Sequence, residues 1–230
     1  MSDKIYKLSP SDFAYLYEEC KLCYFLKGRG LIERPRGIMP GVFNAINSRV
    51  QTGLINKNLK DLFPDLPDGT IVSQEGFVES VIVPGTSVYI KGKYDLLMKN
   101  PDGTYTIIDL KLSQPGEDKV EKYMTQLSSY KFAFENPKVG KPIKISRLAL
   151  LIFYPDKVEY RKGITYLDFP HTWMEVPIDD GKFLNFMKDI DKLLKGPRPG
   201  PGENCIYCQY RSNFDSLKPE KIAEQEDIPF

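Results

Sequence analysis

The chain has few of the residues on which several enzyme classes depend. Its 230 residues include one histidine, His171, so a hydrolase built on a Ser-His-Asp triad would have to use that residue. His171 lies in the loop-like stretch Phe169–Trp173, and we interpret it as an ordinary surface histidine. The longest apolar run, Leu148–Tyr154, is far too short to cross a bilayer. Nothing resembles a targeting peptide, a low-complexity linker or an internal repeat. We therefore expect a cytoplasmic protein with no membrane partner.

Charge of one sign is not in excess either. The net charge of +1 does not by itself indicate a nucleic-acid-binding protein, but the distribution along the chain is uneven. Basic side chains gather in segments 21–37 and 117–147, and the tail 215–230 is acidic. Such basic segments can follow the phosphates of DNA, or they can be ordinary solvated faces. The basic residues are Lys21, Lys27, Arg29, Arg34, Arg36, Lys119, Lys122, Lys131, Lys138, Lys141, Lys144 and Arg147.

Two neighbouring predicted strands carry acidic and basic side chains in a specific pattern. The first strand, Val88–Leu97, alternates apolar and polar residues and includes Asp95. After an Asp-Gly turn, the strand Tyr105–Leu112 carries Asp109 and Lys111 two residues apart, so both side chains leave the same face. A hairpin in this register brings the two carboxylates together. That arrangement is costly without a cation between them, because like charges a few ångströms apart raise a pKa or recruit a metal.

These residue types suit hydrolysis of a phosphodiester with a divalent metal ion. Mg²⁺ or Mn²⁺ is held by oxygen ligands, and waters left in its shell supply the nucleophile. Asp95 and Asp109 are the candidate carboxylate ligands, with the Leu110 carbonyl as a third oxygen and Glu79 as an additional ligand. Lys111 would orient or help deprotonate the water, or stabilise charge in the transition state. The alternative is a hairpin with surface ion pairs, since an Asp-x-Lys pattern alone is common.

A helix predicted from Glu117 to Phe134 follows these strands. It carries Gln126 and Tyr130 four residues apart, and residues at that spacing share one helix face. We expect this face to meet the two acids and the DNA. The alternative is that the polar pair only contributes to core packing.

Together these motifs resemble the RecB-like branch of the PD-(D/E)XK nuclease superfamily, close to the CRISPR-associated adaptation nucleases and the helicase–nuclease repair subunits. The resemblance lies in Gly92–Asp95, Ile108–Lys111 and Gln126–Tyr130, and it extends to Leu8–Ser11, Cys20 and Cys205–Cys208. It implies an α/β fold with a mixed central β-sheet flanked by helices (a restriction-endonuclease-like core), dependence on a divalent metal, and cleavage of DNA. It also implies a catalytic set, namely Asp95, Asp109, Lys111, Gln126 and Tyr130.

The four cysteines are a second signal. They form two Cys-x-x-Cys pairs near the two ends of the chain, Cys20 with Cys23 and Cys205 with Cys208. Each pair presents two thiolates to one centre, as in tetrahedral metal sites and iron–sulfur clusters. Disulfides fit poorly, because we expect a reducing compartment. The spacing alone does not separate zinc from an iron–sulfur cluster.

The resemblance favours a 4Fe–4S cluster over zinc, which stays the alternative. The related nucleases use one cysteine near the amino terminus and three near the carboxy terminus. Here Phe214 stands six residues after Cys208, where the last cysteine of that pattern would be expected, and Cys23 is additional. We therefore expect Cys23 to replace the missing ligand.

The remaining pattern predicts one nuclease domain, 1–230, with 41% hydrophobic residues for a single core. We expect the nuclease core at about 40–195, metal-binding segments at 9–37 and 196–214, and an acidic tail at 215–230. The Pro- and Gly-rich stretch 196–202 is predicted to be a stiff strap that returns the second cysteine pair to the first. The first predicted helix is capped by Ser9 or Ser11 and runs through Leu16 to about Leu26. The other predicted helices are Gly41–Leu62, Glu117–Phe134 and Asp180–Leu194. The predicted strands are Ile71–Val83, Val88–Leu97, Tyr105–Leu112, Arg147–Tyr154, Val158–Tyr166 and Trp173–Val176, of which Arg147–Tyr154 and Val158–Tyr166 are expected to form a hairpin.

The function expected is a metal-dependent deoxyribonuclease, most simply an exonuclease acting on DNA ends or single strands. Its context would be repair, recombination or CRISPR spacer acquisition, with proteins of those pathways as further partners. Asn44 or Asn47 stands near the place where many RecB-like relatives have a histidine ligand, so the metal shell is expected to contain oxygen only. The alternative function is a non-catalytic nuclease-fold subunit that binds DNA or a partner protein.

Overall fold

A five-stranded mixed sheet forms the centre of the protein. The structure is a computed structural model and describes residues 4–35, 37 and 40–216. The strand order is β10-β7-β6-β5-β2, with β6 and β7 parallel and the other neighbours antiparallel. The central strands β6 and β7 are buried for most of their length, as expected for strands covered on both faces. The bounds are β2 Thr70–Gln74, β5 Leu96–Lys99, β6 Tyr105–Leu112, β7 Ile145–Phe153 and β10 His171–Val176.

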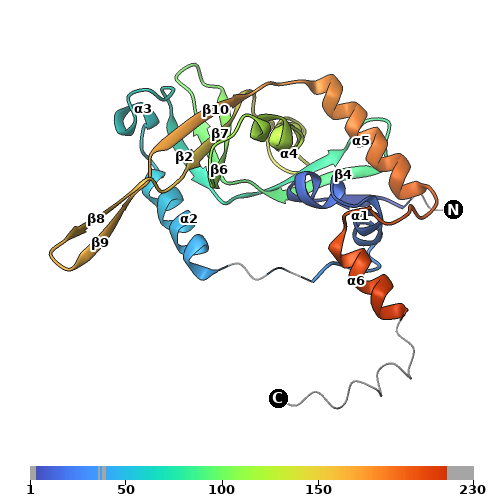
Figure 1. The fold of residues 1–230 in the computed structure, drawn as a ribbon. Helices are drawn as coiled ribbons and strands as arrows, with labels where there is room; N and C mark the ends of the chain where they lie inside the picture. The colour runs from blue at the N-terminus through green and yellow to red at the C-terminus, as the bar shows by residue number, and fades with distance from the viewer. Residues whose placement is uncertain (1–3, 36, 38–39, 217–230) are drawn as a thin grey trace, which may run out of the picture.

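Helices cover both faces of this sheet (Figure 1). On one face, α2 (Gly41–Leu54) and α3 (Leu59–Leu62) enclose a core cluster that includes Ile108 and Leu151. On the other face, α4 (Asp118–Glu135) encloses a second cluster. The predicted α/β fold with a mixed central sheet flanked by helices is confirmed.

A three-stranded sheet, ordered β1-β4-β3, stands beside the first. Its strands pack with α4 and α5 around a third core cluster. The bounds are β1 Tyr6–Leu8, β3 Phe77–Ile82, β4 Val88–Lys93 and α5 Asp180–Lys195.

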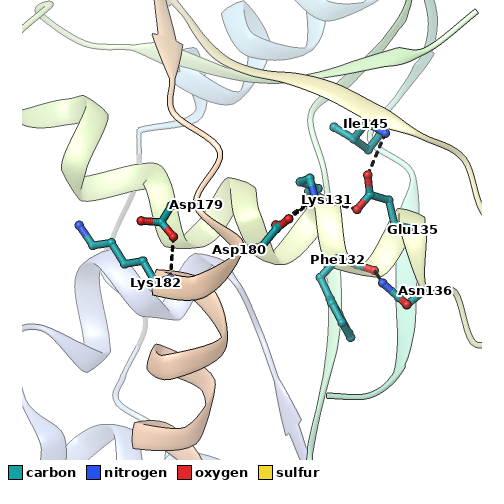
Figure 2. A network of polar contacts seen from close by, with 8 residues as sticks. All are labelled: Lys131, Phe132, Glu135, Asn136, Ile145, Asp179, Asp180 and Lys182. Atoms are coloured by element: carbon teal, nitrogen blue, oxygen red, sulfur yellow. Dashed lines mark hydrogen bonds and ion pairs between the residues drawn. The ribbon is translucent and has the colours of Figure 1, made fainter. Parts of the chain in front are cut away.

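The buried side chain of Lys131 links helix α4 to the start of helix α5 (Figure 2). The ammonium of Lys131 lies 2.7 Å from Glu135 Oε2 and 2.9 Å from Asp180 Oδ1, at the start of α5. Glu135 in turn accepts a hydrogen bond of 3.1 Å from the backbone N–H of Ile145, at the start of β7. The network fixes α4 against α5 and the central sheet, and α4 carries the predicted polar pair Gln126 and Tyr130.

The amino-terminal region differs from the predicted helix Ser9–Leu26. It contains a short π-helical turn, η1 (Phe13–Tyr17), and a separate helix, α1 (Lys21–Gly28). Cys20 is the N-cap of α1 rather than a residue near the end of a long helix. The predicted helix Gly41–Leu62 is likewise divided, because the chain leaves α2 and Asn56 adopts a positive φ of 59° before α3 begins.

Two predicted strands are each divided between the two sheets. The chain between β2 and β3 turns at Glu75, whose φ is 47°, and the chain between β4 and β5 changes sheet at Tyr94 and Asp95. The alternation in β4 ends before β5, whose residues Leu96–Met98 are all buried. Such a pattern does not tell which sheet each half joins.

The predicted hairpin of Arg147–Tyr154 with Val158–Tyr166 is wrong. β7 lies between β6 and β10, and the second segment is itself a hairpin of β8 (Lys157–Arg161) and β9 (Ile164–Asp168). Lys162 and Gly163 form its turn with φ of 47° and 78°, values typical of a type I′ hairpin turn. The hairpin projects from the body (Figure 1), and all residues of its strands are exposed.

Candidate active site and candidate metal centre

Asp95 and Asp109 face each other where the chain enters the central sheet. The pairing of β5 with β6 begins with Leu96 opposite Ile108, so Asp95 stands directly before β5 and opposite Asp109. Asp95 Oδ2 accepts a hydrogen bond of 2.9 Å from the backbone N–H of Leu110. The hairpin register predicted for the two acids is therefore present, although Asp95 belongs to the crossing between the sheets.

The electrostatics of this pair are unfavourable without a cation. Burial, together with the neighbouring Asp109 carboxylate, raises the pKa of Asp95 to about 7, even though Lys111 and the Leu110 N–H act in the opposite direction. Asp109 is only 3% exposed. Its Oδ2 atom is buried and forms an ion pair with the Lys111 ammonium rather than a hydrogen bond of good geometry. A buried carboxylate beside a second carboxylate fits a divalent cation bound by oxygen ligands.

Lys111 is held against Asp109. Its ammonium lies 2.7 Å from Asp109 Oδ2 and 4.4 Å from the centre of the Tyr123 ring. Burial on its own lowers the pKa of Lys111, but the Asp109 and Asp95 carboxylates outweigh burial and raise that pKa. The residue therefore keeps its positive charge, which suits orientation of a water or stabilisation of developing negative charge better than removal of a proton.

The predicted face of α4 meets the acids. Gln126 Nε2 donates a hydrogen bond of 3.0 Å to Asp109 Oδ1. Tyr130 donates to the backbone carbonyl of Lys93 at 2.7 Å, and its ring packs against Gly92, where an added Cβ would lie 3.1 Å from Tyr130 Cε1. Gln126 therefore orients a carboxylate, whereas Tyr130 holds the end of β4 just before Asp95.

Glu79 does not join this group, which corrects its assignment as an additional ligand. It lies on β3, in the other sheet, where it pairs with Lys91 of β4. Its carboxylate is engaged by Lys91 at 2.8 Å and by Lys138 at 2.5 Å. Within the part of the chain that the structure describes, no group of three carboxylates that could share one ion includes Asp95, Asp109 and Glu79.

A cavity of about 780 Å³ opens beside Asp95 and Lys111. Asn44 and Asn47 of α2 line it, so these two amides reach the same space as Asp95 and Lys111. Tyr15 also lines the cavity, and no sequence signal pointed to it, because it meets Tyr123 across 108 positions of the chain. The residues that line the cavity include Tyr15, Phe43, Asn44, Asn47, Asp95, Lys111 and Tyr123.

His171 lies outside this cavity. It begins β10 rather than a loop, and its Nε2 atom lies 3.0 Å from Asp65 Oδ2.

The four cysteines form one compact group that joins the two ends of the described chain. Cys20 and Cys23 come from the start of α1, and Cys205 and Cys208 from the start of α6 (Ile206–Asp215). All four Sγ atoms lie within 4.8 Å of one another. Three of the separations are 3.7 Å, namely Cys20 to Cys208, Cys23 to Cys205 and Cys23 to Cys208. The predicted meeting of the two cysteine pairs is confirmed.

Nearby donors favour the thiolate form of Cys20, whereas burial and the neighbouring thiols raise the pKa values of Cys23 and Cys208. Burial on its own raises the pKa of the Cys20 thiol, but the backbone N–H groups of Cys23 and Gly202 lower it to about 6. An added Cβ at Gly202 would lie 2.6 Å from the Glu19 carbonyl oxygen, so glycine lets the strap approach Cys20. Arg34 Nη2 donates to Cys205 Sγ at 3.0 Å. Hydrogen-bond donors and a guanidinium beside several sulfurs match the requirement of a metal site for deprotonated ligands.

The predicted basic segments do not form a single basic surface. Most of their described side chains are ion-paired: Lys21 with Glu18, Lys27 with Asp12, Arg34 with Glu19, Lys131 with Glu135 and Asp180, Lys138 with Glu79, and Arg147 with Glu175. Lys122 differs, because its ammonium lies 4.5 Å from the centre of the Tyr15 ring at the cavity. Arg36 and residues 217–230 of the acidic tail lie outside the described residues.

None of the helices in the described part of the chain is both long enough and apolar enough to cross a membrane.

Comparison with known proteins identifies the family. A family model described as the PD-(D/E)XK nuclease superfamily matches residues 41–213, about three quarters of the chain. No match was found among curated proteins. Among solved structures, the chain is similar to SSO0001, with 16% identity, a TM-score of 0.48, and coverage of 96% of this chain and 89% of the other. It is also similar to an alkaline exonuclease from Laribacter hongkongensis, with 11% identity, a TM-score of 0.42, and coverage of 95% and 94%.

Proposed function

The chain belongs to the PD-(D/E)XK nuclease superfamily, and we propose that within it the protein is a divalent-metal-dependent deoxyribonuclease, an exonuclease acting on DNA ends or single strands. The observation that carries this proposal is the pairing of the buried Asp109 with the partly buried Asp95, which lines a cavity open to a substrate, with Lys111 2.7 Å from Asp109. Two neighbouring carboxylates repel each other, and a bound divalent cation would neutralise that repulsion. Such a pair is therefore expected in a metal-binding site.

The residues present fit Mg²⁺ or Mn²⁺. Asp95, Asp109 and the Leu110 carbonyl would hold the ion, and the amides of Asn44 and Asn47 line the same cavity. A bound divalent cation supplies an activated water and neutralises charge on the scissile phosphate. Lys111, fixed by Asp109, orients the attacking water and stabilises the negative charge that develops on phosphate oxygens. Gln126 keeps Asp109 in the orientation required of a ligand, as is usual for groups that support metal ligands.

We further propose that the protein is a RecB-like nuclease of one domain, 1–230, with a nuclease core at about 40–195. The Gln126–Tyr130 motif and the cysteine pairs at both ends support this branch. They also support a context of repair, recombination or CRISPR adaptation, in which proteins of those pathways would be partners. The chemistry proposed for the site does not depend on which pathway supplies the DNA or on a partner protein.

For the cysteine centre we propose a single tetrahedral ion, zinc, in place of the 4Fe–4S cluster that the resemblance favours. Zn–S bonds of about 2.3 Å place tetrahedral sulfurs about 3.8 Å apart, close to the observed separations of 3.7 Å. A 4Fe–4S cluster binds each thiolate to a different iron atom, so its four sulfurs must lie farther apart than sulfurs around one ion. The structural role is the same for either centre, because it joins the two ends of the chain.

The nuclease activity is tested with end-labelled single-stranded and double-stranded DNA, incubated with Mg²⁺, Mn²⁺ or a chelator. We expect cleavage that needs the metal and is lost in Asp109→Asn, while Asp156→Asn, which changes an exposed carboxylate before β8, cleaves like the wild type. Robust cleavage by Asp109→Asn would exclude this mechanism. Failure of the wild type to cleave with either metal would favour the non-catalytic subunit instead.

The metal centre is tested by elemental analysis of protein purified without oxygen. We expect a colourless protein with zinc bound by the four cysteines. A brown protein with stoichiometric iron and sulfide would refute zinc and restore the cluster. A normally folded, metal-free protein in which all four cysteines are serine would refute the structural role of any metal.

A further inference from the structure

We propose that the cavity binds an unpaired nucleobase on the ring of Tyr15, so that the enzyme selects single-stranded DNA; this inference rests on the proposed nuclease function. Tyr15 is 52% exposed, although its neighbours Phe13, Leu16 and Tyr17 in η1 are buried. A large aromatic ring is therefore presented to the space beside Asp95 and Lys111.

The ring of Tyr15 is held in place rather than free to rotate. Its hydroxyl is hydrogen-bonded to the hydroxyl of Tyr123 on α4, and the two ring centres lie 6.2 Å apart with a tilt of 58°. An aromatic ring fixed before the substrate arrives loses little conformational entropy on binding. Aromatic side chains that stack on bases are the usual means by which proteins bind single strands without reading their sequence.

The backbone around Tyr15 also has an uncommon conformation. η1 is a π-helical turn, in which the N–H of Glu18 bonds to the Phe13 carbonyl at 3.3 Å. Turns of this kind are rare and occur frequently at functional sites. Here the wider turn carries three buried side chains into the core and leaves Tyr15 directed at the cavity.

Positive charge lies beside the rings, where the phosphates of a bound strand would pass. Lys122 Nζ lies 4.5 Å from the Tyr15 ring centre and 5.9 Å from that of Tyr123. Lys111 Nζ lies 4.4 Å from the Tyr123 ring centre on the side of the acids. Two ammonium groups next to aromatic rings match the alternation of phosphate and base in a single strand.

α2 contributes another part of the cavity lining. Phe43 is 46% exposed, and the amides of Asn44 and Asn47 line the cavity with it. Amides can hydrogen-bond to base edges, and a second aromatic ring adds apolar contact. The cavity volume of about 780 Å³ lies in the range of about 300–1,000 Å³ that is typical of sites for small molecules. A paired base inside a duplex is stacked on both faces, so only an unpaired base can use Tyr15.

The test measures DNA binding separately from cleavage. Calcium replaces magnesium, and fluorescence anisotropy follows a short labelled oligothymidine and a blunt duplex of equal length. We expect Tyr15→Ala to weaken single-strand binding about 5- to 100-fold, the effect of losing one base–aromatic stack. Tyr15→Phe keeps the ring and should bind close to wild type. Phe77→Ala is the matched control, because Phe77 is an aromatic residue on β3 with 76% exposure that does not line the cavity.

Three other binding results would overturn the inference, and a loss of cleavage alone would overturn only the proposed nuclease activity. Single-strand binding by Tyr15→Ala at wild-type strength would refute stacking on this ring, even if the enzyme cleaves DNA as proposed. Equal losses in Tyr15→Ala and Tyr15→Phe would assign the effect to the hydroxyl bond with Tyr123. Equal losses for duplex and single strand would refute selection of single strands. If the wild type binds single strands through Tyr15 but cleaves nothing with Mg²⁺ or Mn²⁺, the proposed nuclease activity fails while the binding site stands.

Discussion

Asp95→Asn should stabilise the metal-free protein while it abolishes nuclease activity. In the unfolded chain, Asp95 ionises near its ordinary pKa of 3.8, whereas in the folded protein its pKa is about 7. Between these values the folded state holds a proton that the unfolded state has released. Stability therefore falls as the pH rises through this window and changes no further above about pH 7. Asparagine has no charge to bury, so the variant escapes this loss.

The magnitude follows from the same shift. The difference between 3.8 and about 7 corresponds to on the order of 4 kcal/mol at pH 8, at about 1.4 kcal/mol for each pH unit. Asp95 is only partly buried and opens on the cavity, where water screens its charge, so we expect roughly half of this value. A gain of about 2 kcal/mol raises the melting temperature of a chain of this length by about 4–8 °C.

The assay is thermal unfolding with a chelator at pH 5 and pH 8, for wild type, Asp95→Asn and the control Asp156→Asn. The advantage of Asp95→Asn over wild type should be larger at pH 8 than at pH 5, since only part of the loss has occurred at pH 5. Added Mg²⁺ should stabilise the wild type more than the variant, because the variant lacks a ligand. An Asp95→Asn protein that is less stable than wild type at pH 8 would refute the repulsion between the two acids.

Three further variants and one change of metal test neighbouring parts of the structure. Lys111→Ala should reduce cleavage about 100-fold or more in a steady-state assay, as for a lost charge-stabilising group, with metal binding retained in titration calorimetry. Gln126→Ala should lower the rate of cleavage without changing the melting temperature measured with metal bound. Full activity of this variant would indicate that Gln126 contributes only to packing. Initial rates in Mg²⁺ and Mn²⁺ should be similar, because the shell contains oxygen only, whereas a strong Mn²⁺ requirement would contradict that shell. Arg34→Gln should release zinc to a chromogenic chelator faster than wild type, because it removes the guanidinium 3.0 Å from Cys205; an unchanged rate would refute that role.

The closeness of Asp95 and Asp109 was predictable because their geometry is local. Asp109 and Lys111 stand two apart on one strand, and a short turn returns that strand to the chain next to Asp95, so sequence spacing determines their distance. The cysteine pairs were predictable for another reason, since four thiols in two pairs have few stable uses in a chain without disulfides. In both cases the residue types and their spacing along the chain restrict how the side chains can be arranged more than the rest of the fold does.

The parts that were not predictable depend on contacts between distant segments. The apolar–polar pattern does not tell that β4 and β5 belong to different sheets, and the prediction of single strands placed Glu79 closer to the acids than β3 allows. Likewise, Tyr15 reaches the cavity only through η1 and its bond to Tyr123. Periodicity reports which face of a segment is buried, but not which sheet or helix buries it.

The cysteine centre and the active site are connected through η1. The last residue of η1, Tyr17, is followed within three positions by Cys20, and the backbone N–H of Cys20 bonds to the Leu16 carbonyl at 3.0 Å. A metal that fixes Cys20 therefore also restrains the turn that presents Tyr15 to the cavity. The buried rings of Phe13 and Tyr17 pack against Phe186 of α5 with centres 5.2 and 4.9 Å apart, which holds the turn from its other side. With the metal removed, α5 and the hydrogen bond from Tyr15 to Tyr123 would still hold η1, while the restraint through Cys20 is lost. The position of the Tyr15 ring should then loosen before the central sheet, whose acids lie on β6 and directly before β5, is disturbed.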